Sequence, residues 1–226
     1  MHKISMSNVI AFKRKKNENS QRTFINNLKI VKPKGEDEGG GDYWIHSLST
    51  IGTVFKTEDK NQLFEKIEVI NDKIQPLTAT ISKNMYRRNM EILRNFGDLE
   101  VSHFKPNFSL NYLAKPKEKS IVKIKKVPLQ ILPHHVFTFK EKNIDKIGAV
   151  WFVSKLGGYS VQELGVFTDA LYRYLKLHYS KDYEVSPEYC TTIDVISLNE
   201  VNYQQIQDKV VPSDLNATLD AIGKFL

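Results

Sequence analysis

The chain has 226 residues, of which 41% are apolar and 26% are charged, as is typical of a soluble globular protein. A chain of this length buries enough surface to fold without a disulfide or a structural metal. Its single cysteine, Cys190, excludes a disulfide within the chain and a cysteine-rich zinc site. The net charge of +7 favours contact with anions such as phosphate, although it also serves solubility.

The sequence contains no apolar run long enough to span a membrane, and its first residues lack the apolar core of a signal peptide. We therefore expect a cytoplasmic protein with no membrane partner. The high content of Lys, Asn and Ile, which have AT-rich codons, suggests a bacterial or phage source.

Residues 1–41 carry most of the net charge. Nine basic and four acidic residues give this stretch five of the seven net positive charges. Its densest basic cluster consists of Lys13, Arg14, Lys15 and Lys16. Glycines at 39–41 indicate a flexible hinge, while apolar residues such as Phe12 can dock parts of the stretch on a core. The sequence predicts a basic, partly flexible arm.

Residues 42–97 show the period of amphipathic helices. Apolar residues recur three and four positions apart in three runs, of which Asp42 caps the first and Gly97 ends the last. The predicted helices are 42–55, 58–74 and 78–96. Because no pair of acidic side chains points inward, we expect no di-metal bundle site. In residues 98–119 the apolar residues follow no regular spacing, so we predict an extended connector that packs through its aromatic rings.

Strand patterns begin at residue 120. The predicted strands are 120–127, 129–139 with a break at Pro133, 147–153 and 188–198. Between the last two, a glycine turn leads into a helix whose Ser160 and Glu163 form a capping box. A final helix begins after Ser213 or Asp214.

The resulting order, β-β-β-α-β-α after the helical unit, predicts an α/β fold, with α+β as the alternative. We expect a three-helix unit packed on a small mixed sheet, with residues 120–226 forming an α/β sandwich.

In topology, the strands around the long helix resemble the core of restriction-endonuclease-like nucleases over residues 120–198. In that family an Asp on one strand and a Glu-x-Lys motif on the next hold Mg²⁺ and polarise the attacking water. Lys155 stands at the position of the family's lysine, but Val153 replaces the acid, and the preceding strand offers no acid, so Glu163 would have to substitute. The resemblance implies a divergent or degenerate nuclease, or another phosphate-acting enzyme. Its candidate catalytic residues are His134, His135, Lys155, Glu163 and Asp194.

The two histidines are adjacent in an extended stretch, so their side chains point to opposite faces and do not chelate one ion together. Either His134 or His135 serves as a general base or phosphate contact near Lys155, or both are structural residues beside the proline bend. Asp194 interrupts an apolar strand. It either needs a basic or amide partner or lies on an exposed face, and we favour the exposed face.

Together with His178, His135 and Asp194, Cys190 has the residue types that a nucleophile set requires. Because Cys190 lies in an apolar strand, where cysteine is usually buried and inert, we interpret it as a core residue.

Basic residues interleaved with tyrosines are the features that favour nucleic-acid binding. These residues are Lys13, Arg14, Lys15, Lys16, Lys123, Lys125, Arg173 and Lys176. No zinc finger, recognition helix or phosphate-binding glycine loop accompanies them, and a solvated charged face is the alternative. We expect a non-catalytic accessory or interaction protein that binds a macromolecular partner. A protein partner is the first candidate and nucleic acid the second, and no cofactor is expected unless the nuclease alternative holds and brings Mg²⁺.

Overall fold

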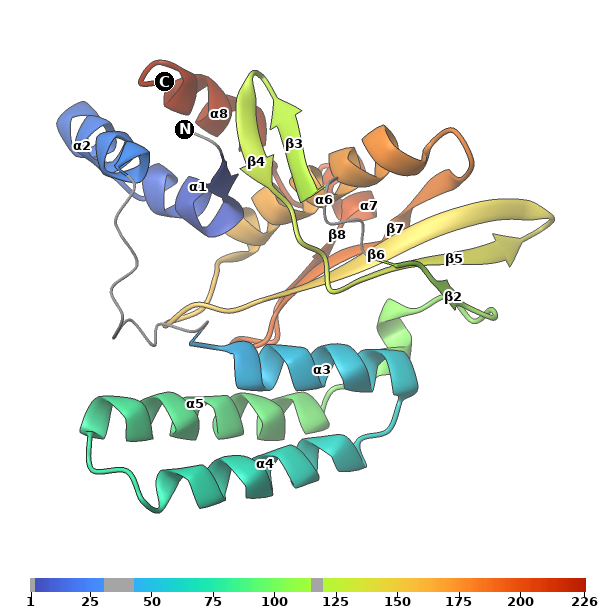
Figure 1. Cartoon of the computed structure of the whole chain (residues 1–226). Coiled ribbons are helices and arrows are strands. Elements are labelled where there is room, and N and C mark those ends of the chain that lie inside the picture. Colours follow the sequence, from blue (N-terminus) through green and yellow to red (C-terminus); the bar gives the residue numbers. More distant parts are fainter. Residues whose placement is uncertain (1–2, 31–42, 115–119) are drawn as a thin grey trace.

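The computed structural model describes residues 3–30, 43–114 and 120–226. Within these ranges the chain forms eight α-helices and two mixed sheets, one of three strands and one of five, so the fold is α/β as predicted. The five-stranded sheet lies between a helical layer on one face and a mixed layer of helices and the small sheet on the other (Figure 1).

The larger sheet has the strand order β2-β5-β6-β7-β8. The strands are β2 (Asn111–Tyr112), β5 (His135–Glu141), β6 (Ile144–Val153), β7 (Glu184–Asp194) and β8 (Glu200–Asn202). β6 and β7 are parallel neighbours, and all other pairs in this sheet are antiparallel. Because parallel neighbours need a crossover, the long helix α6 (Val161–Tyr179) joins β6 to β7 in a βαβ unit.

The predicted three-helix unit covers one face of this sheet. It consists of α3 (Ile45–Thr57), α4 (Asn61–Ile74) and α5 (Thr80–Gly97), followed by the short 3₁₀ helix Val101–Phe104. Fully buried rings join the two layers, since Phe55 and Phe96 of the helices contact Phe152 of β6 edge to face, with ring centroids 5.7 Å apart in both pairs. The predicted cap Asp42 lies outside the described residues.

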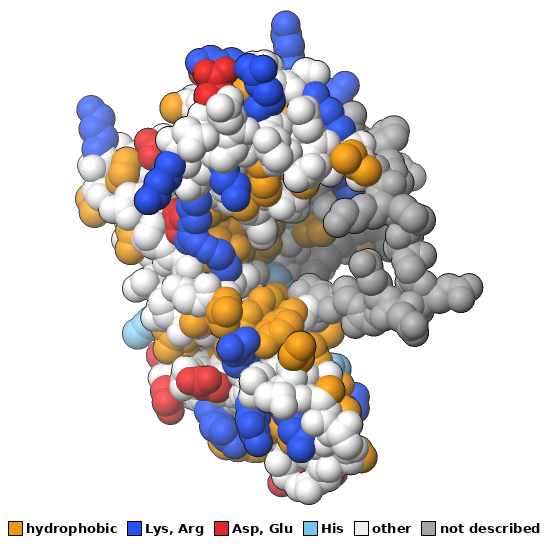
Figure 2. Space-filling model, turned by 90° about the vertical axis from the view of Figure 1, so that its left-hand side faces the viewer, with side chains coloured by type: hydrophobic (Ala, Val, Ile, Leu, Met, Phe, Trp, Pro, Cys, Tyr) orange, Lys and Arg blue, Asp and Glu red, His pale blue; other side chains and the backbone are white. Residues whose placement is uncertain are grey.

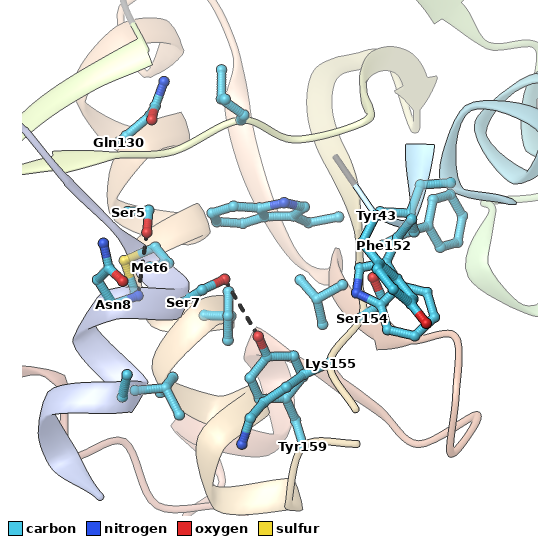
Figure 3. A pocket seen from close by; sticks show the side chains of 18 of the residues that line it. Ser5, Met6, Ser7, Asn8, Tyr43, Gln130, Phe152, Ser154, Lys155 and Tyr159 are labelled. Atoms are coloured by element: carbon cyan, nitrogen blue, oxygen red, sulfur yellow. Dashed lines mark hydrogen bonds between the residues drawn. The ribbon is translucent and has the colours of Figure 1, made fainter. Parts of the chain in front are cut away.

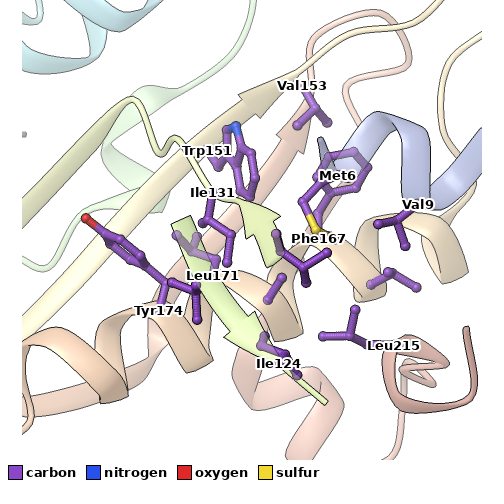
Figure 4. Packing of buried hydrophobic residues seen from close by; sticks show 14 of the residues in the cluster. Met6, Val9, Ile124, Ile131, Trp151, Val153, Phe167, Leu171, Tyr174 and Leu215 are labelled. Carbon is purple, nitrogen blue, oxygen red and sulfur yellow. The ribbon is translucent and has the colours of Figure 1, made fainter. Parts of the chain in front are cut away.

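The other face of the sheet packs against α6 and a second layer of structure. That layer contains β1 (Ile4–Ser5), α1 (Met6–Lys13), α2 (Glu18–Lys29), β3 (Ile121–Ile124), β4 (Val127–Gln130), α7 (Tyr203–Gln207) and α8 (Leu215–Gly223). Its core is centred on Trp151 of β6, whose indole meets the ring of Phe167 of α6 at 86° (Figure 4). Met6 and Leu215 bring the first and last helices into the same cluster.

The prediction of one strand over 129–139 is wrong. The structure divides this stretch between β4, in the small sheet, and β5, in the large sheet. Pro133 lies in the link between the two strands, and it has no N–H to donate to a strand ladder. The chain therefore changes sheets at this point.

Residues 3–30 are folded and do not form a free arm. β1 pairs in parallel with β4, and Met6, Val9 and Phe12 of α1 are at most 1% exposed. The apolar residues of this stretch outweigh its charge, because burying them in the core stabilises the docked state. The predicted hinge at 39–41 lies outside the described residues.

Phe12→Ala is expected to lower the free energy of unfolding by about 3 kcal/mol or more, because it empties a fully buried site. Urea denaturation followed by circular dichroism measures the change. Lys16→Ala, at an exposed position just after α1, is the control and should leave the midpoint unchanged. Equal midpoints for both variants would mean that this segment does not belong to the core.

Candidate functional site

A cavity of about 1230 Å³ opens at the carboxyl end of β6. One wall comes from β1 and α1, and the opposite wall comes from the start of α3 and from α5. The end of β6, at Trp151 to Val153, and the loop that follows it form the floor. Figure 2 shows this hollow between the two parts of the molecule, with hydrophobic side chains and lysines or arginines around it.

Aromatic rings line much of the cavity. Both tryptophans of the chain, Trp44 and Trp151, take part, together with Tyr43, Phe152 and Tyr159. In Figure 3 the rings of Tyr43 and Phe152 lie on the far side from the start of α1, and Tyr159 stands below. The Tyr159 hydroxyl donates a hydrogen bond to Ser7 Oγ at 3.3 Å, which ties the loop after β6 to α1. Trp151, Phe152 and Tyr159 are buried, so Tyr43 and Trp44, which are partly exposed, are the rings that a ligand can reach.

The charged residues that line the cavity are all cationic: Arg14, Lys15, Arg88 and Lys155. Among the described lining residues there is no Asp or Glu. Arg14 is neutralised by an ion pair with Glu163, and Arg88 donates a hydrogen bond to the Tyr43 hydroxyl at 2.8 Å. Lys15 and Lys155 join none of the ion pairs found in the described ranges. The mouth therefore favours an anion.

Three large apolar side chains stand exposed at the edge of the same cavity. Ile45, Leu132 and Leu156 are 51%, 50% and 61% exposed, and they come from α3, the β4–β5 link and the loop after β6. Exposed apolar residues from separate elements that converge on one hollow are a mark of a binding surface.

Asp194 fixes the loop that forms the cavity floor. Its carboxylate is fully buried, so the expectation that it lies on an exposed face is wrong. It accepts hydrogen bonds from the Tyr159 N–H at 2.8 Å, the Ser197 hydroxyl at 2.8 Å and the Ile196 N–H at 3.1 Å. Gly158 has φ of +72°, and a Cβ there would lie 2.8 Å from Asp194 Oδ2, so only glycine fits against the carboxylate. Asp194 therefore has a structural role, which is to hold this loop in place.

Glu163 is also engaged within the fold. As predicted, it completes a capping box with Ser160 at the start of α6. Both of its carboxylate oxygens also accept hydrogen bonds from the guanidinium of Arg14. Burial of Glu163 opposes its ionisation, but the hydrogen bonds from Arg14 and Ser160 outweigh burial and lower the pKa of the carboxyl. This ion pair fastens α1 to α6.

The expectation that the two histidines point to opposite faces is wrong, because both imidazoles lie beside Gly52 of α3, where an added Cβ would be 3.5 Å from His134 Cδ2 and 3.6 Å from His135 Nε2. His134 lines the cavity, and its Nδ1 accepts a hydrogen bond from the Phe152 N–H at 3.2 Å. His135 faces the helical unit, where its Nε2 contacts the carbonyl of Gly52 and its ring stacks on Phe55. Of the five candidate catalytic residues, only His134 and Lys155 share the cavity.

Cys190 is fully buried, and burial raises the pKa of its thiol well above the ordinary value. Such a thiol is protonated and unreactive at neutral pH, which fits its interpretation as a core residue. In the described ranges, no three His, Cys, Asp or Glu side chains are grouped closely enough to hold a metal ion.

The basic candidates are spread over three regions: the end of α1, the β3–β4 hairpin and α6. Four of them form ion pairs, namely Lys13 with Asp214, Arg14 with Glu163, Lys125 with Asp220 and Arg173 with Asp169. Lys16, Lys123 and Lys176 are exposed. Only Arg14 and Lys15 belong to the cavity lining.

Sequence reasoning missed most of the cavity. No sequence pattern marks Trp44, Arg88, Asn8 or Gln130 as functional, although all four line the cavity. These residues come from α1, α3, α5 and β4, and no local pattern connects them. The one available signal was that the chain has only two tryptophans, which both turn out to line this hollow.

Comparisons with models of known protein families, with curated proteins and with solved structures find no match for this chain. None of the helices in the described ranges has the length and apolar character required to cross a membrane.

Asp194→Ala is expected to lower the free energy of unfolding by about 3 kcal/mol, because it leaves buried N–H and O–H donors without an acceptor. Chemical denaturation measures the loss. Asp182→Ala, at an exposed turn position, is the matched control and should change stability little. A wild-type midpoint for Asp194→Ala would refute the role assigned to this carboxylate.

Glu163→Gln is expected to cost about 1 kcal/mol at neutral pH, because it removes the charge paired with Arg14. A carboxyl whose pKa is lowered by folding stabilises the protein above its ordinary pKa of 4.5, and this stabilisation is lost as the pH falls through the lowered value. The gap in melting temperature between wild type and Glu163→Gln should therefore close as the pH drops below 4.5. Glu91→Gln, on the exposed face of α5, is the control and should leave the melting temperature at neutral pH nearly unchanged.

Proposed function

We propose that the protein is a non-catalytic binding protein that holds single-stranded nucleic acid at the cavity beside β6. The observation that carries this proposal is the combination, in one hollow, of both tryptophans with two lysines that join no ion pair and with no acidic lining residue within the described ranges. Proteins that bind single strands combine cationic grooves with aromatic platforms on which bases stack.

The cavity supports a single strand better than a duplex. Its partly exposed rings, Tyr43 and Trp44, lie at a hollow, so a base must leave a helical stack to reach them. Bases in single strands are already available for stacking, and each stacked base contributes about 1–3 kcal/mol. Lys15 and Lys155 then meet the phosphates that flank the inserted base.

We propose a non-catalytic role because the candidate catalytic carboxylates already have structural hydrogen bonds. Both carboxylates among the catalytic candidates, Asp194 and Glu163, are engaged in hydrogen bonds that hold loops and helices together. We place this binding in the cytoplasm, the compartment that the sequence favours. A protein that docks on Ile45, Leu132 and Leu156 is the second candidate, because these exposed apolar residues border the same cavity.

The test is a titration of the purified protein with short single-stranded oligonucleotides. Because Trp44 and Trp151 both line the cavity, their intrinsic fluorescence should change on binding without any label. The affinity should fall as salt rises from about 50 to 500 mM, with a slope of about −0.7 per phosphate contact. Lys155→Ala should reduce that slope by about 0.7 and weaken binding several-fold.

Lys123→Ala is the matched control, because it removes one exposed lysine from β3, which does not line the cavity. It should leave both the affinity and the salt slope unchanged. If no oligonucleotide alters the tryptophan fluorescence at low salt, the proposal fails, and the apolar rim becomes the leading site for a protein partner. Cleavage of the oligonucleotide in Mg²⁺ or Mn²⁺ that is lost in Lys155→Ala would instead favour the nuclease alternative.

A further inference from the structure

Two arginines line the cavity, and they differ in charge balance. Arg14 is paired with Glu163, whereas Arg88 of α5 joins none of the ion pairs found in the described ranges. Glu91, which follows Arg88 by about one turn of α5, is exposed and forms no ion pair with it in those ranges. Arg88 is itself partly exposed, so its positive charge is available to an anion in the cavity.

Tyr43 is held at two points by α5. Its hydroxyl accepts a hydrogen bond from the Arg88 guanidinium at 2.8 Å. Its carbonyl accepts a hydrogen bond from the side-chain amide of Asn89, which is fully buried, at 2.9 Å. Two consecutive residues of α5 therefore fix both ends of Tyr43, on the wall that Figure 3 shows across the cavity from Ser7 and Asn8.

Tyr43 in turn packs against Trp44. The two rings meet edge to face at 66°, with their centroids 4.5 Å apart. Both rings are partly exposed and both line the cavity, so they are the rings that a base reaches. Because Arg88 holds the hydroxyl of Tyr43, the orientation of this aromatic pair depends on the guanidinium.

The guanidinium has more donors than Tyr43 uses. Arginine carries five N–H groups in a planar fork, and the Tyr43 hydroxyl is the acceptor that the described residues provide to Arg88. A phosphate presents several acceptor oxygens and matches such a fork with two parallel hydrogen bonds. Because the Tyr43 hydroxyl already restrains the side chain, less rotamer entropy is lost when Arg88 binds a phosphate.

We infer that Arg88 binds a phosphate of the ligand and also positions the Tyr43–Trp44 pair, an inference that rests on the proposed binding of single-stranded nucleic acid. One side chain then couples the two parts of recognition, since a base that stacks on the rings brings its own phosphate close to them. Lys15 and Lys155 come from the segment after α1 and from the loop after β6, so they meet neighbouring phosphates.

The first test compares two consecutive arginines of α5. Arg88→Ala should weaken binding of a labelled single-stranded oligonucleotide about tenfold or more, because it removes hydrogen bonds to a charged group. It should also reduce the salt slope by about 0.7, the value for one phosphate contact. Arg87→Ala removes an exposed arginine that does not line the cavity, and it should change neither quantity. Wild-type affinity and slope in Arg88→Ala would overturn the inference.

Fluorescence anisotropy of the labelled oligonucleotide is the appropriate readout, because these substitutions also change the surroundings of Trp44. Arg88→Lys keeps the positive charge but lacks the planar fork, so it should retain the salt slope and bind several-fold more weakly than wild type. Wild-type affinity in Arg88→Lys would overturn the role of the fork. Melting temperatures show whether each variant is folded, and Arg88→Lys carries the test if Arg88→Ala proves unstable.

A double-mutant cycle tests the coupling between Arg88 and Tyr43. Tyr43→Phe keeps the ring and removes the hydroxyl that restrains the guanidinium, so it should weaken binding several-fold without changing the salt slope. In the Arg88→Ala background, Tyr43→Phe should have little further effect, whereas in the Arg87→Ala background it should keep its full effect. Additive losses in the Arg88→Ala background would overturn the coupling.

Two outcomes separate this inference from the proposed function. Salt-dependent binding that is weakened in Lys155→Ala but not in Arg88→Ala would overturn the role of Arg88 and leave the binding function standing. Absence of binding to every oligonucleotide would overturn both.

Discussion

The buried carboxylate of Asp194 is the constraint on which the site depends. It lies at the end of β7 and accepts hydrogen bonds from the loop that leaves β6, so it joins the carboxyl ends of the two parallel strands. The three donors supplied by Tyr159, Ile196 and Ser197 compensate for removing the charge from water. Because Tyr159 then reaches Ser7, the position of α1 follows from the same carboxylate.

The opposite wall depends on a second buried polar residue, Asn89 of α5. The first residue before α3 is Trp44, whose side chain cannot cap a helix. Asn89 Oδ1 accepts from the Ser47 N–H at 3.0 Å and from the Ser47 hydroxyl, while its amide donates to the carbonyls of Tyr43 and Met85. A neighbouring helix thus supplies the cap, which leaves Trp44 able to line the cavity.

Local patterns predicted α3, α4, α5, α6 and α8, because burial of one face repeats along each of them, but they did not predict α1, α2 or α7. The helix predicted at 58–74 is found at Asn61–Ile74, and the capping box of Ser160 and Glu163 forms as expected. The two-residue strands β1 and β2 were missed because such short segments have no period of their own. Asp194 was misplaced because its partners are backbone groups of a distant loop, and the cavity was missed because its walls meet only through the register of β1 with β4.

The parallel pairing of β1 with β4 also sets an order of folding. The helices of the three-helix unit contact one another over short sequence distances, so they can collapse early. β1 must wait for β4, which lies more than half the chain away, and closing so large a loop carries a high entropic cost. We therefore expect the wall that carries Asn8 and Gln130 to form late in folding. During synthesis on a ribosome, the apolar side of α1 remains exposed until most of the chain has emerged.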